Sequence, residues 1–231
     1  MSTYLELCAD LRSETTDSGT GPSAVTGNTG ELARVVKWIK DAWVDLQQEK
    51  DDWFWMRKSF TVSAISNDGE YAYSDCTDTV SLAAISRFSH WYKHSFKCYL
   101  TSAGVGAECP LRWLPWEDFR AIYRYGTQTN SAPEHVSQDP TGKFVLGPKP
   151  DATYTVSGDY QIGPQILVAN ADEPEMPSRF HRLIVCEAMT RYAGHRVAPE
   201  VMARAVTEGG RLRSALGRDQ LPEITRGRSI A

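Results

Sequence analysis

The sequence contains no run of apolar residues that approaches the ~18–20 needed for a membrane-spanning helix. Its N-terminus, MSTYLELCADLRSE, has neither the basic start nor the apolar stretch of a secretory signal. Positive charge is also in short supply, because 25 lysines and arginines face 29 aspartates and glutamates, giving a net charge of −4. We therefore expect no membrane partner and no generic binding of duplex DNA by the whole surface, which requires a basic face.

Cysteine is sparse, and its pattern excludes a disulfide framework or a zinc finger. The chain has five cysteines, an odd number, and no two of them form a CxxC pair. They are Cys8, Cys76, Cys98, Cys109 and Cys186. We expect reduced, mostly buried thiols in a cytosolic product.

Recognisable catalytic and cofactor motifs are missing as well. The sequence contains no GxSxG, no HExxH and no Cys/His signature. Gly142-Lys143 lacks the upstream glycine and the following serine or threonine of a P-loop. His90 and His94 have the spacing of a helical metal pair, but their surroundings alternate like a strand, in which four residues span roughly 13 Å. We expect no catalytic residue, no metal site and no cofactor.

What the sequence does contain is a set of clear helix signals at its N-terminal end. Thr3 and Glu6 have the spacing of a capping box, which predicts a short helix over about residues 3–14. Residues 15–30 are rich in Gly, Ser and Thr and predict a loop. Asn28 or Thr29 then caps a second helix with a wide apolar stripe suited to packing on other helices. The stripe consists of Leu32, Val35, Val36, Ile39, Ala42, Trp43 and Leu46.

The period of the sequence changes near Trp53, where alternation of apolar residues indicates β-structure. Asn67-Asp68-Gly69 is a hairpin-turn signal between two such segments. Residues 87–100 (RFSHWYKHSFKCYL) predict one strand, and Trp116 begins a short helix that runs through Tyr123. Further strands are predicted from HVSQD, FVLGP and TYTVSGDYQI, with the turn PTGK between the first two.

Helical periodicity returns after Pro177, where Ser178 is the expected cap. The expected buried side of this helix consists of Phe180, Leu183, Ile184, Ala188, Met189 and Tyr192. Pro199 suits the first turn of a last helix, and Gly217 is placed to stop it.

Together these patterns predict an α+β fold. A helical bundle is built from residues 1–57 and 177–217, and residues 58–176 form a β-rich insert. Residues 218–231 have no helical or strand period and contain Pro222, so we expect an extended, basic C-terminal arm. A frayed terminus is the alternative interpretation of that arm.

Four segments, in this order and with similar spacing, resemble the head–tail adaptor (connector) proteins of tailed bacteriophages. They are GELARVVKWIKDAW, DWFWMR, LGPKPDATYTVSGDY and EPEMPSRFHRLIVCEAM. The similarity is greatest to portal-attached adaptors of short-tailed phages, and it covers nearly the whole chain. The motifs are packing and turn patterns, and the matched positions are structural. They are Gly30, Trp53, Trp55, Pro148, Pro150, Tyr154, Tyr160 and Pro177.

The resemblance implies a structural virion protein and not an enzyme. Such proteins form a homo-oligomeric ring under the portal protein, typically of twelve copies. The ring extends the channel through which genomic DNA passes without sequence-specific binding. It also attaches tail components such as nozzle, tube or fibre proteins. The implied location is the head–tail interface of the virion, after assembly in the host cytoplasm.

In this setting, the C-terminal arm becomes the candidate docking site. We expect it to be disordered in the free subunit and to dock, extended, on the portal or on a neighbouring subunit. Apolar side chains would fill shallow sites, and arginines would pair with carboxylates. The candidate site residues are Arg218, Leu221, Ile224, Arg226, Arg228 and Ile230.

Three other classes of function stay open at this point. A carbohydrate- or ligand-binding β module would use the group of Trp91, Trp113 and Trp116, although packing in the core of a small β domain explains the group more simply. A DNA-binding accessory protein would use the C-terminal arginines. An enzyme would need a convergent polar cluster, for which Asp159, His135 and His94 are the candidates.

Overall fold

The structure is a computed structural model that describes residues 2–15 and 20–222. It has five α-helices and two β-sheets within these residues, which confirms the α+β class. The chain divides into two compact units. A helical unit contains Met1–Met56 and the chain from Pro164 onward, and a β-rich unit contains Arg57–Gly163. The expected insert, 58–176, therefore extended too far, because the segment after Gly163 packs with the helices.

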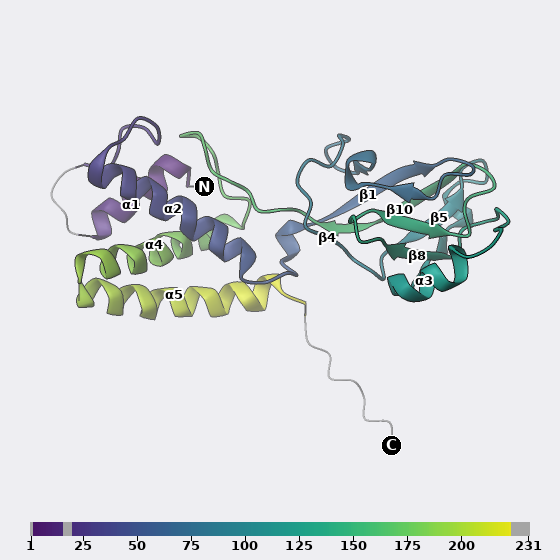
Figure 1. Cartoon of the computed structure of the whole chain (residues 1–231). Coiled ribbons are helices and arrows are strands. Elements are labelled where there is room, and N and C mark those ends of the chain that lie inside the picture. The colour runs from purple at the N-terminus through teal and green to yellow at the C-terminus, as the bar shows by residue number, and fades with distance from the viewer. Residues whose placement is uncertain (1, 16–19, 223–231) are drawn as a thin grey trace, which may run out of the picture. The chain divides into compact units, whose positions relative to one another are not determined.

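The helical unit is arranged around one central helix (Figure 1). Helix α4 (His181–Arg196) packs against α1 (Tyr4–Glu14) and α2 (Gly30–Gln48) on one side and against α5 (Pro199–Gln220) on the other. Buried side chains lie all around α4, as expected for a helix enclosed by neighbours. They are His181, Leu183, Ile184, Val185, Cys186, Ala188, Met189, Tyr192 and Ala193.

The local signals that begin these helices are visible in the structure. Thr3 and Glu6 form the predicted capping box, with the Glu6 amide donating to the Thr3 hydroxyl and the Thr3 amide donating to the Glu6 carboxylate. Thr29 is the N-cap residue of α2, but its side chain makes no capping hydrogen bond. Ser178 does not cap α4, because a 3₁₀ turn over Ser178–Phe180 precedes the helix. Pro199 occupies the first turn of α5, as predicted.

The end of α5 differs from the prediction. The helix continues through Gly217 to Gln220, and the amide of Leu221 donates to the Gly217 carbonyl at 3.2 Å. A glycine ends a helix when it adopts a positive φ, and Gly217 does not. The helix ends instead at Leu221, whose φ of −111° and ψ of 150° are extended. Pro222 explains this, because a residue that precedes proline is disfavoured in the helical region.

The β-rich unit contains two sheets (Figure 1). The larger sheet has the order β3-β1-β10-β5-β6, with β4 also pairing with β10, and the smaller sheet has the order β2-β9-β8-β7. The larger sheet comprises β1 (Arg57–Ala64), β3 (Thr77–Asp78), β4 (His90–Trp91), β5 (Lys97–Leu100), β6 (Cys109–Pro110) and β10 (Tyr154–Gln161). The smaller comprises β2 (Glu70–Tyr71), β7 (Arg112–Trp113), β8 (His135–Gln138) and β9 (Phe144–Gly147).

Aromatic side chains from both sheets meet in the core of this unit. Phe60 on β1 lies 4.7 Å from the ring of Trp91 on β4 and 5.9 Å from that of Phe144 on β9. Phe96 and Tyr160 complete the cluster around Phe60. Each such pair adds about 0.5–1.5 kcal/mol beyond the burial of its area, so this cluster helps to hold the two sheets together.

The predicted hairpin around Asn67-Asp68-Gly69 is wrong. The segment does turn, but β1 pairs with β10 over its whole length while β2 pairs with β9 in the other sheet. A two-residue hairpin of the favoured type needs positive φ at both central positions. Of the three residues in this turn, Asn67 has a positive φ, whereas Gly69 does not.

The single strand predicted over residues 87–100 is also wrong, because the segment forms two short strands, β4 and β5. Both pair with β10, at Tyr160↔Trp91 and at Ser157↔Lys97. Between them the chain turns, and the Ser95 hydroxyl accepts a hydrogen bond of 2.8 Å from the Asp159 amide. Trp53 and Trp55 were expected to lie on a strand, but Trp53 directly precedes a 3₁₀ turn (Phe54–Met56) and Trp55 lies within it, with the two rings stacked 4.4 Å apart.

Helix α3 (Trp116–Tyr123) is confirmed at its predicted bounds. The two predicted strands on either side of the predicted turn are β8 and β9, and they pair as an antiparallel hairpin with Gln138 opposite Phe144. Asp139 organises the turn, since its carboxylate accepts from the amides of Thr141 and Lys143.

Candidate functional site

The predicted docking arm is only partly within the described residues. Arg218 lies in the last turn of α5 with its side chain exposed, and so it belongs to a helix and not to an extended arm. Leu221 is the first extended residue and is half-buried. Ile224, Arg226, Arg228 and Ile230 lie outside the described residues. An arm can therefore begin no earlier than Leu221.

Ion pairs fasten α5 to the rest of the helical unit. Arg182 on α4 bonds Glu14 at 2.7 Å and Glu208 at 3.2 Å, which ties α1, α4 and α5 together. Arg213 on α5 contacts Glu187 and Glu49 at 2.5 and 3.3 Å. Arg204 on α5 likewise pairs with Glu14 at 3.3 Å, so two arginines of α5 are neutralised within the unit.

Two members of the Arg182 cluster have shifted pKa values. Burial acts to lower the pKa of Arg182, but its hydrogen bonds to Glu208 and Glu14 outweigh that effect and raise it. The pKa of Glu208 is lowered, chiefly by the hydrogen bond from Arg182. Arg182 and Glu208 are therefore both charged at neutral pH.

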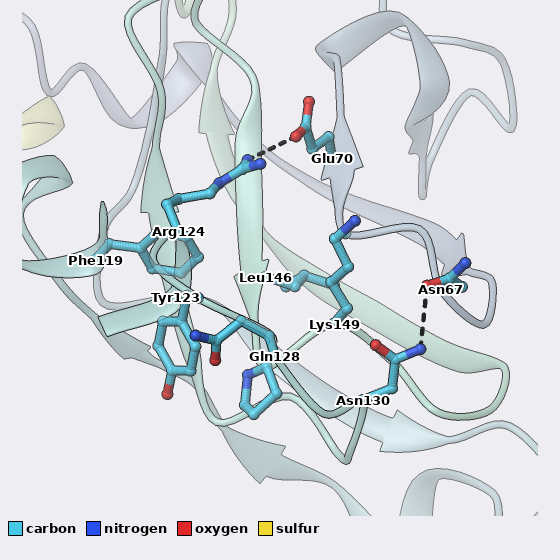
Figure 2. Close-up of a pocket in the computed structure, with 12 residues that line it drawn as sticks. Asn67, Glu70, Phe119, Tyr123, Arg124, Gln128, Asn130, Leu146 and Lys149 are labelled. Carbon is cyan, nitrogen blue, oxygen red and sulfur yellow. Dashed lines mark hydrogen bonds and ion pairs between the residues drawn. The ribbon is translucent and has the colours of Figure 1, made fainter. Parts of the chain in front are cut away.

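The β-rich unit has a pocket of about 320 Å³ between α3 with its following loop and the ends of β2 and β9 (Figure 2). Arg124 reaches Glu70 across it at 2.6 Å, and the Asn130 amide donates to Asn67 at 3.2 Å. Lys149 also lines the pocket and forms no ion pair with the described residues. The wall is tightly packed, because a Cβ atom at Gly147 would lie 2.5 Å from the Tyr123 ring.

The lining of this pocket offers polar groups that can bind a ligand. Its described residues supply amides, an ion pair and one unpaired ammonium, and they include neither serine nor cysteine. An acidic or carboxylate group would find its donors here. The pocket could not be predicted from the sequence, because its walls come from segments that lie far apart in the chain.

The three residues named for an enzyme do not converge in one cluster. Asp159 on β10 forms an ion pair with Arg57 at 2.5 Å and accepts from the Ser59 hydroxyl at 2.7 Å. His135 lies on β8 in the other sheet and bonds the Tyr123 hydroxyl at 2.8 Å. His94 is exposed in the turn between β4 and β5. Each group therefore has a structural setting of its own.

The three tryptophans considered as a ligand-stacking surface lie in different environments. Trp91 is 2% exposed in the aromatic core. Trp113 is half-buried against Phe96, with ring centroids 5.9 Å apart, and Trp116 stacks on Phe119 at 6.1 Å. They do not form one open stacking face. Among the described residues, no group of three or more His, Cys, Asp or Glu side chains could hold a metal ion.

Four of the five cysteines are buried and one, Cys109, is exposed. Burial raises the pKa of Cys8 and Cys76 to about 12 and that of Cys98 and Cys186 to about 11. Thiols with such values stay protonated at neutral pH and are poor nucleophiles.

Comparison with known families matches residues 2–229 to the SU10 adaptor proteins. The chain belongs to the SU10 adaptor protein family. The resemblance to phage head–tail adaptors is thereby confirmed over nearly the whole sequence. No curated protein matches the chain.

As an SU10 adaptor, the protein is a phage structural component whose location is the virion. Members of such a family join other virion parts and are typically not enzymes. The functional surfaces of an SU10 adaptor are thus its contacts with portal and tail proteins. None of the helices in the described part of the chain is both long and apolar enough to cross a membrane.

Proposed function

We propose that the protein forms a homo-oligomeric ring of twelve copies beneath the portal. The ring extends the DNA channel, so that genomic DNA passes through its lumen without sequence-specific binding. Its lower side attaches the tail nozzle, tube or fibre proteins. The observation that carries this proposal is the match of residues 2–229 to the SU10 adaptor proteins.

Within this ring we assign the body to the helical unit. The ion pairs of Arg182 and Arg213 tie its helices into one block, as a subunit under load during packaging and ejection requires. The residues after Gln220 form the docking arm, which contacts the portal or a neighbouring subunit. A single arm binds weakly because ordering it costs conformational entropy, whereas a ring of arms binds strongly through multivalency.

Electron cryomicroscopy of purified virions tests this proposal. The expected result is a ring of this protein between the portal and the tail. Native mass spectrometry of the isolated portal–tail complex then gives its copy number, with the portal protein as the internal reference. Finding the protein outside the portal–tail complex would refute the proposal.

A further inference from the structure

A short loop of the β-rich unit presents two aliphatic side chains to solvent. It follows β3 and is closed by a bridge between Thr77 and Ala84. Val80 is 80% exposed and Leu82 is 78% exposed. No residue from Thr79 to Ser86 carries a charge. The loop lacks the basic and aromatic residues that nucleic acid or lipid headgroups would select, so an uncharged apolar surface is the partner that it fits.

The loop is held rigidly by a buried carboxylate. Asp78 is 3% exposed and accepts hydrogen bonds from the amides of Val80 and Ser81, at 2.9 and 2.6 Å. Its other oxygen accepts from the Tyr160 hydroxyl at 2.8 Å. The amide of Leu82 donates to the Asp78 carbonyl at 2.9 Å. Because the loop is preorganised, little conformational entropy is lost when its two side chains are buried.

The backbone at Leu82 adds a second, independent observation. Its φ is +55°, in the left-handed region that glycine and asparagine adopt with less strain. A strained residue with an exposed apolar side chain brings no advantage to the isolated fold. Such outliers gather at functional sites, where the side chain is needed for a contact.

The same chain carries an apolar hollow of about 480 Å³ in its helical unit. Its walls come from α1, α2, the loop before α2 and the segment after Pro164. The apolar lining consists of Tyr4, Val25, Ala33, Val36, Leu167 and Val168. Val168 is 63% exposed, so the hollow has an open apolar edge.

Charges beside the two features are complementary. Lys37, Lys40 and Asp41 line the hollow. Lys37 forms an ion pair with Asp41, whereas Lys40 forms none with the described residues. Asp75 is exposed and shares a shallow depression with Thr77 at the base of the loop. The Asp75 carboxylate beside the loop and the Lys40 ammonium beside the hollow thus have opposite charges, which favours contact between the two features.

We propose that the Val80–Leu82 loop of one copy inserts into the Val36–Leu167–Val168 hollow of the next copy. This inference rests on the proposed ring. A ring closes through a heterologous contact, which needs two different, complementary surfaces on each subunit. The loop and the hollow are such a pair.

Photo-crosslinking identifies the occupant directly. A benzophenone amino acid replaces Leu82 in the full-length protein, and assembled portal–adaptor complexes are irradiated and digested. The expected crosslinks join position 82 to peptides of a second copy that contain residues 25–40 or 164–170. Crosslinks to the portal or to a tail protein, or none to a second copy, would overturn the inference. An absence of any ring would instead refute the proposed function.

Two substitutions measure the energetics of the contact. Leu82→Gly should leave the melting temperature unchanged or raised, because strain is relieved, and should weaken ring assembly roughly tenfold. Val105→Gly is the control, since Val105 is 68% exposed at an ordinary φ and should not affect assembly. Val168→Ala should weaken assembly too, and its effect should largely vanish in the Leu82→Gly background. If Leu82→Gly and Val168→Ala have additive effects on assembly, the proposed contact is contradicted. It is also contradicted if Leu82→Gly forms rings as stable as those of the wild type. Both results leave the proposed ring itself unaffected.

Discussion

Tyr160 on β10 donates its hydroxyl proton to the carboxylate of Asp78, at the end of β3, over 2.8 Å. Both residues are 3% exposed. This bond joins a central strand of the larger sheet to its edge and fixes the base of the Val80–Leu82 loop. It links the stability of the β-rich unit to the presentation of its most exposed aliphatic side chains.

Replacing Tyr160 with phenylalanine should destabilise the protein by about 1–3 kcal/mol, because a buried carboxylate oxygen loses its donor. Urea denaturation followed by tryptophan fluorescence measures the change. Tyr99→Phe is a matched control on the neighbouring strand β5, since no hydrogen bond of its hydroxyl is found among the described residues. It should alter the free energy of unfolding by less than about 0.5 kcal/mol. Equal effects of the two substitutions would contradict this assignment.

Asp78 should also make the unit sensitive to acid. Burial acts to raise the pKa of its carboxyl group, but the hydrogen bonds from Ser81, Tyr160 and Val80 outweigh this and hold the pKa below its ordinary value of 3.8. Its contribution to stability is therefore present above the unfolded pKa and is lost as the pH falls through the folded one.

Urea midpoints measured between pH 7 and pH 3 should fall most steeply below pH ~4. Asp78→Asn should flatten this dependence while lowering stability at pH 7. If the stability of Asp78→Asn falls with decreasing pH as steeply as that of the wild type, other carboxylates dominate the sensitivity to acid.

Arg182 should be the principal ionic contact of the helical unit. Arg182→Met should lower the free energy of unfolding by about 1–2 kcal/mol, because Glu14 and Glu208 lose their shared partner. The effect should shrink in high salt, since all three side chains are partly exposed. Thermal unfolding at two salt concentrations provides the measurement. Arg211→Met is the control, because Arg211 is exposed and has no ion-pair partner among the described residues.

Truncation after Gln220 should separate folding from docking. The described fold is complete by that residue, so the melting temperature should stay within about 1–2 °C of the full-length value. Attachment to the portal should be lost, as measured by co-sedimentation with portal rings. If the truncated protein binds the portal as well as the full-length protein does, the arm has no role in attachment.

The sequence predicted those elements whose signals are local. The capping box of Thr3 and Glu6, the Pro199 start of α5 and the Asp139 turn each act within a few residues, and each is found in the structure. Gly217 failed as a stop signal because the residue before Pro222, four positions later, ended the helix instead. Competition between two nearby signals cannot be decided from either signal alone.

Features that depend on distant segments could not be predicted. Residues 67–69 form a turn without a hairpin because β10, some ninety positions later, is the better partner for β1. The pocket of Figure 2 brings Asn67 and Lys149 together from opposite ends of the β-rich unit. The uncharged run after Asp78 can be seen in the sequence. Only the positive φ of Leu82 indicates that this run forms an exposed loop with a constrained backbone.

The pairing of β1 with β10 places Arg57 opposite Gln161, so the β-rich unit begins and ends side by side. The helical unit, by contrast, must join α2 to α4 across more than a hundred intervening residues. If the β-rich unit folds first, its paired ends replace that long flexible loop with a short one. This reduces the entropic cost of closing the helical unit by roughly 1.5 kcal/mol. We therefore expect an order of folding in which the strands in the middle of the chain precede, and speed, the docking of its two helical ends.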